Sequence, residues 1–161
     1  MYAEGAFDEF MKTGNPELVT KEQYESWVKA SLRPGKYAEV VAANGEFPGQ
    51  YMTTPDGRLG IARLQFGNVV LMPQMAAGSG DNAFQVVHGT NAAPPHTYIA
   101  SYLWLQHGFK ADAMIHFGTH GSLEFTPRKQ VALCSDDWPD RLVGALPHLY
   151  IYSIGLSLIH I

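Results

Sequence analysis

The second half of the sequence alternates short β-rich runs with apolar helical patterns, and this order constrains the fold more than any other feature. Residues 84–88, 111–117 and 149–154 are predicted to be strands, and residues 95–107 and 137–146 to be helices. Such alternation is typical of an α/β fold that has a mixed or parallel sheet with flanking helices. Ligands bind at the carboxyl ends of strands in folds of this kind. We therefore expect a functional site where one of these strands ends.

Residues 1–59 are predicted to be a helical and loop segment that leads into the core at residues 60–155. Residues 2–12 show an amphipathic pattern. Thr20 and Gln23 resemble a capping box, in which each side chain satisfies an unpaired amide at the start of a helix, and a helix follows over about 21–32. The Arg33-Pro34-Gly35 sequence ends that helix, because proline lacks an amide donor and glycine accepts left-handed dihedral angles.

The middle of the chain is predicted to be a loop followed by extended structure. Residues 43–59 contain two prolines and three glycines, which is typical of a loop or hinge. The β-rich runs 60–64 and 68–72 lie around Phe66-Gly67-Asn68 and predict a hairpin. Residues 76–81, with two glycines around a serine, predict a second loop.

Composition excludes several classes of protein. The net charge of −4 argues against a nucleic-acid-binding protein, which usually shows a basic face. The single cysteine cannot form an internal disulfide. No apolar run reaches the 18 residues or so that a membrane-spanning helix needs, and the chain does not open on a basic and then apolar leader. We therefore expect a cytoplasmic protein with no membrane span and no nucleic-acid partner.

The histidines are distributed very unevenly. Residues 1–60 carry 15 charged side chains and no histidine, whereas residues 61–161 carry 11 charged side chains and all seven histidines. The second half is therefore poor in charge and rich in imidazole, which suits a buried site better than a solvated surface. The seven are His88, His96, His107, His116, His120, His148 and His160.

Three potential ligands or bases follow the predicted strand 111–117 at intervals of four residues. They are His116, His120 and Glu124. Imidazoles and carboxylates serve as metal ligands or as proton acceptors near neutral pH. Gly118 and Gly121 argue against a continuous helix that would place all three on one face. Spacing alone also allows one core histidine and one solvent-facing histidine, so the pattern by itself leaves both interpretations open.

A much longer stretch carries a family resemblance. The run HFGTHGSLEFTPRKQ at residues 116–130 closely resembles the signature of the large subunit of the multi-subunit tetrapyrrole metal chelatases, the family of CobN and of the magnesium chelatase H subunit. The resemblance covers about residues 60–155, whereas residues 1–59 match less distinctly. Its further motifs are GDN at 80–82, HGT at 88–90, PPHTY at 94–98, YLW at 102–104, DWPD at 137–140 and PHLYIY at 147–152.

The resemblance implies that the chain is an incomplete piece of a large multidomain subunit that binds the tetrapyrrole and contains the site of metal insertion. The implied activity is that of a ligase forming nitrogen–metal bonds, with the 161-residue piece inactive alone. Co²⁺ insertion in cobalamin biosynthesis is the leading expectation, with Mg²⁺ or Fe²⁺ as alternative metals. The implied partners are AAA+ ATPase subunits of the I and D or the CobS and CobT type. They would hydrolyse the ATP, in agreement with the absence of a phosphate-binding loop motif from this sequence.

Metal insertion into a free-base macrocycle displaces two pyrrole protons, so the reaction needs bases above the ring. Our hypothesis makes Glu124 and His120 the principal proton acceptors or transient metal ligands, with His116 second in both roles. The expected contacts to the tetrapyrrole come from two imidazoles, from aromatic rings on its apolar faces and from two cations at its acidic rim. They are His88, His96, Phe117, Phe125, Arg128 and Lys129, with Tyr98, Trp104 and Trp138 as further rings.

Several of these candidates, and some neighbours, have structural alternatives. The aromatic residues of the predicted helix 95–107, including Tyr102, suit a core. His107, at the end of that helix, suits a cation that binds terminal carbonyls. His148 suits a turn after Pro147. Cys134 suits a small buried hydrophobe better than a nucleophile.

Two departures from the family pattern widen the choice. Arg128 stands where relatives usually have glycine, and the SLEF sequence at 122–125 leans toward the HmuS-like branch, which is linked to haem use and metal removal. Residues 156–161 resemble the translation of a transposon end, so we expect a non-native tail there. Haem dechelation is therefore an alternative function. A tetrapyrrole- or metal-binding module without turnover is an alternative of another class, and a small histidine–metal hydrolase is a further one.

Overall fold

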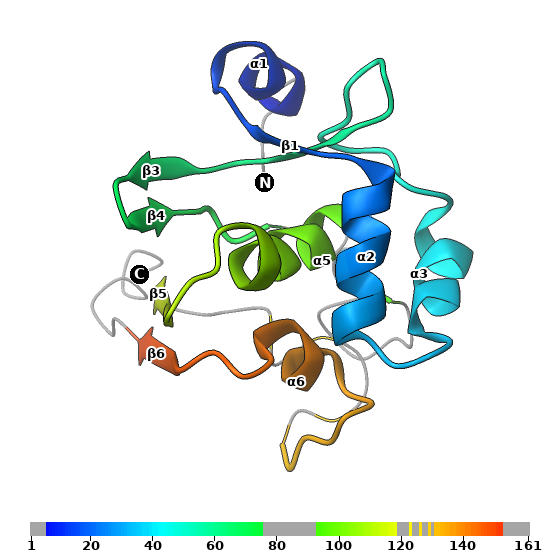
Figure 1. Ribbon diagram of the computed structural model, residues 1–161, viewed down its shortest axis with the longest axis vertical. Coiled ribbons are helices and arrows are strands. Elements are labelled where there is room, and N and C mark those ends of the chain that lie inside the picture. Colours follow the sequence, from blue (N-terminus) through cyan, green and yellow to red (C-terminus); the bar gives the residue numbers. More distant parts are fainter. Residues whose placement is uncertain are drawn as a thin grey trace, which may run out of the picture.

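The computed structural model describes residues 6–75, 93–118, 123, 126, 129 and 131–152, which form a mixed α/β structure (Figure 1). The elements run α1 (Ala6–Thr13), β1 (Glu17–Val19), α2 (Lys21–Ser31), α3 (Lys36–Asn44), β2 (Leu59–Ile61), β3 (Leu64–Phe66), β4 (Val69–Leu71), α5 (His96–Leu103), the π-helical segment η1 (Trp104–Gly108), β5 (Met114–Gly118), α6 (Trp138–Val143) and β6 (His148–Tyr152). The α/β class expected from the sequence is confirmed. The expected strand 84–88 and the loop 76–81 lie outside the described residues.

The start of α2 follows the predicted capping box. The Gln23 backbone N–H donates to the Thr20 hydroxyl at 3.3 Å, and the Thr20 backbone N–H donates to the Gln23 side chain at 3.0 Å. The prediction of a helix over about 21–32 is confirmed. The sequence pattern did not predict α3. This helix begins directly after Gly35, whose backbone is in a left-handed conformation (φ 89°). Helix α2 ends at Ser31, and the left-handed conformation of Gly35 allows the sharp turn into α3.

The strands form three separate two-stranded pairs within the described residues. β1 pairs with β2 and β3 with β4, both antiparallel, whereas β5 and β6 are parallel. The predicted hairpin around Gly67 is present, but its first strand is Leu64–Phe66. The proposed hairpin strand over 60–64 is wrong, because Leu59–Ile61 pairs with β1 instead.

Helix α5 is the centre of the core. All eight of its residues are buried, and it packs against α2, β2 and α6 (Figure 1). The predicted helix over 95–107 is confirmed as α5 followed by η1. The alternative that placed Tyr98, Tyr102 and Trp104 in the core is also confirmed. The helix predicted over 137–146 is confirmed as α6, whose Trp138 and Leu142 are fully buried.

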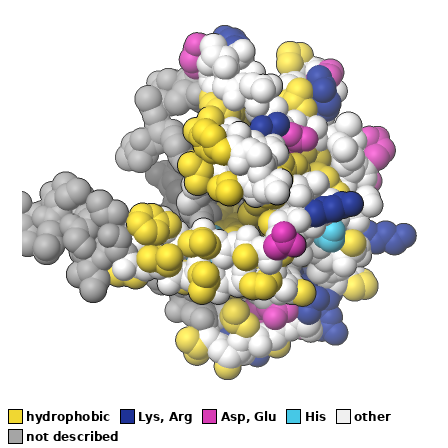
Figure 2. Space-filling view, turned by 60° about the vertical axis from the view of Figure 1, so that its left-hand side comes forward, with side chains coloured by type: hydrophobic (Ala, Val, Ile, Leu, Met, Phe, Trp, Pro, Cys, Tyr) yellow, Lys and Arg dark blue, Asp and Glu magenta, His cyan; other side chains and the backbone are white. Residues whose placement is uncertain are grey.

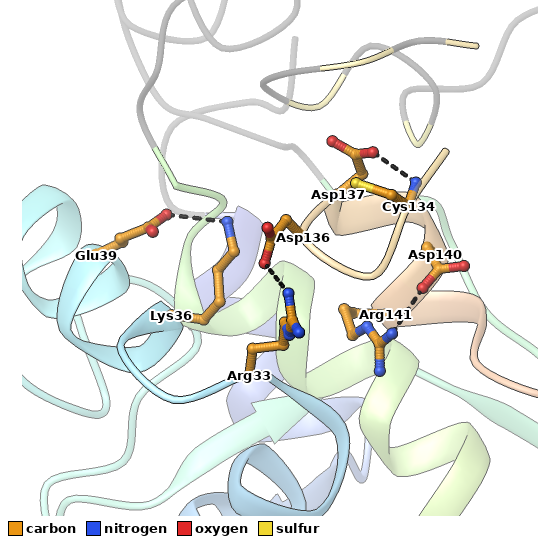
Figure 3. A network of polar contacts seen from close by, with 8 residues as sticks. All are labelled: Arg33, Lys36, Glu39, Cys134, Asp136, Asp137, Asp140 and Arg141. Atoms are coloured by element: carbon orange, nitrogen blue, oxygen red, sulfur yellow. Dashed lines mark hydrogen bonds and ion pairs between the residues drawn. The ribbon is translucent and has the colours of Figure 1, made fainter. Parts of the chain in front are cut away.

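A set of polar contacts joins the α2–α3 turn to the segment before α6 (Figure 3). Arg33 pairs with Asp136 at 3.0 Å. The buried Lys36 ammonium pairs with Glu39 at 3.2 Å and lies 4.8 Å from the centre of the Trp138 ring. These contacts fix the start of α6 against the first half of the chain.

The carboxylate of Asp137 organises the turn that leads into α6. It accepts a hydrogen bond from the Cys134 backbone N–H at 2.8 Å and another from the Lys129 backbone N–H at 3.4 Å. Burial alone would raise the pKa of Asp137, but these hydrogen bonds hold it below its usual value. Cys134 itself is exposed, so the expectation that it is a small buried hydrophobe is wrong.

Large hydrophobic side chains remain exposed on the β3–β4 hairpin and on the β5–β6 pair. Figure 2 turns this side of the molecule forward and shows hydrophobic side chains gathered on it. They include Leu64, Phe66, Val69 and Leu71 of the hairpin, and Ile115, Phe117, Leu149 and Ile151 of the parallel pair. Parallel strands are usually covered on both faces, so the exposed apolar side chains of β5 and β6 are unusual for an α/β sheet. In the described part of the chain, no helix is long and apolar enough to span a bilayer.

Candidate functional site

The parallel pair β5–β6 places His116 on one face of the strands. Met114 pairs with His148 and His116 with Tyr150 in the ladder. Successive side chains of a strand point to opposite faces, so His116 shares its face with His148 and Tyr150. Phe117 lies on the other face and is 74% exposed. The structure thus places His116 and Phe117 on opposite faces of the pair, although both were predicted to belong to the same macrocycle site.

His116 is the centre of a compact cluster of polar rings. Its Nδ1 lies 2.7 Å from Nε2 of His148, and its Nε2 lies 2.9 Å from the Tyr102 hydroxyl of α5. Tyr102 in turn donates to Oε1 of Gln74, in the segment after β4, at 3.2 Å. The ring centres of His116 and Tyr150 are 5.3 Å apart. Side chains from α5 and β6 therefore contact this one imidazole, and Gln74 is joined to it through Tyr102.

These contacts bear on how His116 can act. Both of its ring nitrogens are engaged by neighbouring side chains. A nitrogen that is hydrogen-bonded to a side chain binds a metal only after that contact breaks. The arrangement therefore suits proton handling more directly than metal ligation.

A cavity of about 410 Å³ opens beside this cluster. Apolar side chains make up most of its wall, and its polar lining residues include His148 and Asp140. This volume lies within the range of about 300–1,000 Å³ usual for ligand pockets, which are also mostly apolar. Its lining residues are Leu123, Leu133, Pro139, Asp140, Val143, Gly144, His148 and Tyr150.

Most of the other predicted site residues lie outside the described part of the chain. Lys129 is described, is exposed and donates its backbone N–H to Asp137. Within the described residues, no three His, Cys, Asp or Glu side chains converge as a metal site. The site residues outside the described part are His88, His120, Glu124, Phe125 and Arg128.

His96 is a core residue and lies at the opposite end of α5 from Tyr102. Its Nε2–H donates to the Gly45 carbonyl at 2.9 Å, and its Nδ1 accepts from the Tyr24 hydroxyl at 3.1 Å. Burial lowers its pKa, which favours the neutral ring. The structure does not bring His96 to the His116 cluster, and its ring packs against Tyr37 and Phe47 instead.

The remaining histidine and aromatic candidates also take structural positions. His107 binds the Ser31 hydroxyl at 2.6 Å, and burial lowers its pKa. The expectation of a cation on terminal carbonyls is therefore wrong for this residue. Trp138 is 1% exposed, and Tyr98 and Trp104 are buried as well, so the described structure offers none of these three rings as an open stacking surface.

His148 is the functional candidate that the sequence pattern undervalued, because it suited a turn there. In the structure His148 is the first residue of β6 and contacts His116 directly. The signal was partly available, because both strands were predicted and a parallel pairing was expected. The missing information was the register, which decides whether two histidines on neighbouring strands meet.

The profile of the CobN/Magnesium Chelatase family matches residues 2–156 of this chain. The H subunit of the magnesium chelatase of Rhodobacter capsulatus is 41% identical over 116 residues, which are 71% of this chain and 10% of that protein. The aerobic cobaltochelatase subunit CobN of Pseudomonas aeruginosa is 38% identical over 122 residues, which are 76% of this chain and 10% of that protein. The chain therefore spans about a tenth of the length of these curated relatives.

A solved structure shows the same fold. The catalytic subunit of cobaltochelatase from Mycobacterium tuberculosis matches with a TM-score of 0.73 and 34% sequence identity. The match covers 91% of this chain and 13% of that one. The similarity therefore includes nearly all of this chain and a small part of the larger protein.

Proposed function

Because the chain belongs to the CobN/magnesium chelatase family, we propose that it is a segment of the large, tetrapyrrole-binding subunit of an ATP-dependent metal chelatase. The reaction proposed for the whole subunit is the insertion of Co²⁺ into a corrin precursor. The observation that carries the proposal is the His116 cluster, which lies near the carboxyl end of a parallel strand and shortly before the His120–Glu124 motif. Ligand sites of α/β folds form at such strand ends.

The chemistry asks for bases that accept two pyrrole protons as the metal enters the ring. We assign Glu124 and His120 as the principal proton acceptors or transient ligands, and His116 as the second. Imidazole is suited to this work, because its unperturbed pKa of about 6.5 lies near the operating pH. Both ring nitrogens of His116 are hydrogen-bonded, to His148 and to Tyr102, so it would accept a proton only as one of these contacts breaks, and would pass it along the cluster.

The macrocycle contacts follow from the same assignment. Phe117 lies on the exposed apolar face of the β5–β6 pair, opposite His116, so it would contact a different part of the tetrapyrrole from the reacting nitrogens. Arg128 and Lys129 would pair with acidic groups at its rim, because cations bind carboxylates there. The AAA+ partner subunits would supply the ATP hydrolysis.

Magnesium insertion into a porphyrin is the second candidate. Its support is the 41% identity with the H subunit of a magnesium chelatase, beside 38% identity with a CobN subunit. The two reactions place the same demand on the bases and differ in metal and macrocycle. Removal of the metal from haem is a third candidate reaction for the same site.

The test is a chelation assay on the full-length large subunit that contains this chain, with its partner ATPases, ATP and Co²⁺ or Mg²⁺. The variants are Glu124→Gln and His120→Ala. Loss of a general base lowers turnover by about 10²–10⁴-fold, and we expect a loss of that size in each variant. Unchanged turnover in both variants would sink the assignment, and turnover with Mg²⁺ alone would favour the second candidate.

A further inference from the structure

Tyr102, His116 and His148 form a series of hydrogen bonds in which each residue donates to the one before it, starting from the acceptor Gln74. Nε2 of Gln74 donates to the Met75 carbonyl at 3.4 Å, which leaves Oε1 of Gln74 facing the Tyr102 hydroxyl at 3.2 Å. An amide oxygen only accepts hydrogen bonds, so with the Gln74 amide in this orientation the hydroxyl of Tyr102 donates its proton to Gln74. The direction of this first bond fixes those that follow.

The tautomers of the two histidines follow from that direction. Tyr102 has one hydroxyl proton, so its oxygen accepts the 2.9 Å hydrogen bond from Nε2–H of His116. The neutral form of His116 carries one N–H, so in that form its Nδ1 is an acceptor. Nε2–H of His148 therefore donates to Nδ1 of His116 across 2.7 Å.

The backbone holds His148 where this donation requires it. Met114 N–H donates to the Pro147 carbonyl at 2.9 Å, and Met114 pairs with His148 at the start of the parallel ladder. The His148 ring meets the His116 ring edge-on, with centres 4.7 Å apart and planes at 81°. The 2.7 Å between Nδ1 of His116 and Nε2 of His148 is a hydrogen-bond distance.

We propose that His148 is a positioning residue, which donates Nε2–H to Nδ1 of His116 and thereby holds His116 as the Nε2–H tautomer. The inference rests on the proposed function in one respect, namely that His116 takes part in chelation. The role needs only an N–H donor at this position. A side chain with such a donor and no imidazole should therefore replace His148, whereas an apolar side chain of similar size should not.

The first experiment measures the tautomer of His116 in the 161-residue chain by ¹⁵N NMR of labelled histidine, in wild type, His148→Gln and His148→Leu. The Gln side-chain amide carries a donor close to the position of Nε2 of His148. We expect the Nε2–H tautomer in wild type and in His148→Gln, and a shift toward the Nδ1–H tautomer in His148→Leu. An Nδ1–H tautomer in wild type or in His148→Gln would overturn the proposal, even if the leucine variant did not fold.

The second experiment assays chelation by the full-length subunit with the same two substitutions. Loss of the hydrogen-bond partner that orients a metal-binding histidine typically costs about 10–100-fold in activity, and we expect a loss of the same order for His148→Leu, with an unchanged KM for the macrocycle. His148→Gln should retain most of the wild-type turnover. Equal losses in both variants would contradict the positioning role. The tautomer measurement needs no chelation, so failure of the proposed function and failure of this inference are distinguishable.

Discussion

Removal of the hydrogen bond between Tyr24 and His96 tests how much a buried polar contact stabilises the core. The His96 ring donates Nε2–H to the Gly45 carbonyl, so its Nδ1 has only a lone pair to offer, and the Tyr24 hydroxyl donates to it at 3.1 Å. Tyr24→Phe removes this hydroxyl and keeps the aromatic ring. The ring stacks on Phe47 with centres 5.0 Å apart, so the loss of packing should be small.

The size of the effect follows from burial. Tyr24 is 0% exposed and His96 is 1% exposed, so water cannot replace the lost donor without a rearrangement. Leaving a buried acceptor unsatisfied costs about 1–3 kcal/mol of the free energy of unfolding. In a chain of this length each kcal/mol lowers the melting temperature by about 2–4 °C. The variant should therefore melt about 2–12 °C below wild type.

Urea unfolding followed by circular dichroism measures the change, and Tyr37→Phe is the matched control. Tyr37 also touches the His96 ring, but its hydroxyl donates to Glu25 at 3.3 Å in a partly exposed position. A change there should cost about 0.5 kcal/mol or less. If Tyr24→Phe cost no more than Tyr37→Phe, the buried hydrogen bond would not be what stabilises this part of the core.

Three further predictions concern stability and association. Burial lowers the pKa of His96, so just below pH 6.5 the unfolded chain binds more protons than the folded chain. As the pH falls through this range, the free energy of unfolding should therefore decrease by up to about 1.4 kcal/mol per pH unit. The loss should be smaller in His96→Gln, and an identical pH slope in urea titrations of the two proteins would argue against this. Thr20→Ala removes half of the capping box and should cost about 1 kcal/mol in the same assay, whereas Thr13→Ala at the exposed end of α1 should cost less. The double substitution Phe117→Ser and Leu149→Thr should reduce self-association in analytical ultracentrifugation, because both side chains are exposed and apolar. Each substitution should change the free energy of unfolding by no more than about 0.5 kcal/mol. Unchanged association would refute this prediction.

Local signals were sufficient for the elements whose causes are local. The capping box of Thr20 and Gln23 depends on residues three positions apart, and the structure shows both of its hydrogen bonds. The hairpin around Gly67 likewise depends on its own turn. Helix α3 was missed because the Pro-Gly sequence before it ends one helix and also permits the next to begin. The pairing of β1 with β2 joins residues about 40 positions apart in strands of three residues, so no local pattern reveals it.

The candidate site likewise contains one residue that local patterns predicted and several contacts that they could not predict. The run of motif residues led to His116, and the structure places it on the expected strand, two residues before the carboxyl end of β5. No local pattern joins His116 to His148, Tyr102 or Gln74, because these contacts depend on strand register and on how α5 packs beside the pair. Register is a property of two strands together, and a shift by one residue would turn His148 to the opposite face. The roles of His120 and Glu124 stay predictions from the resemblance.

The most direct measurement of the central claim is ATP-dependent chelation by the full-length large subunit with His116→Ala, compared with His107→Ala. His107 binds Ser31 away from the cluster and serves as the matched control. We predict a fall in turnover of about 100-fold or more for His116→Ala with little change in macrocycle binding, and near wild-type turnover for His107→Ala. Wild-type turnover in His116→Ala would contradict the claim that the imidazole cluster on β5 takes part in metal insertion.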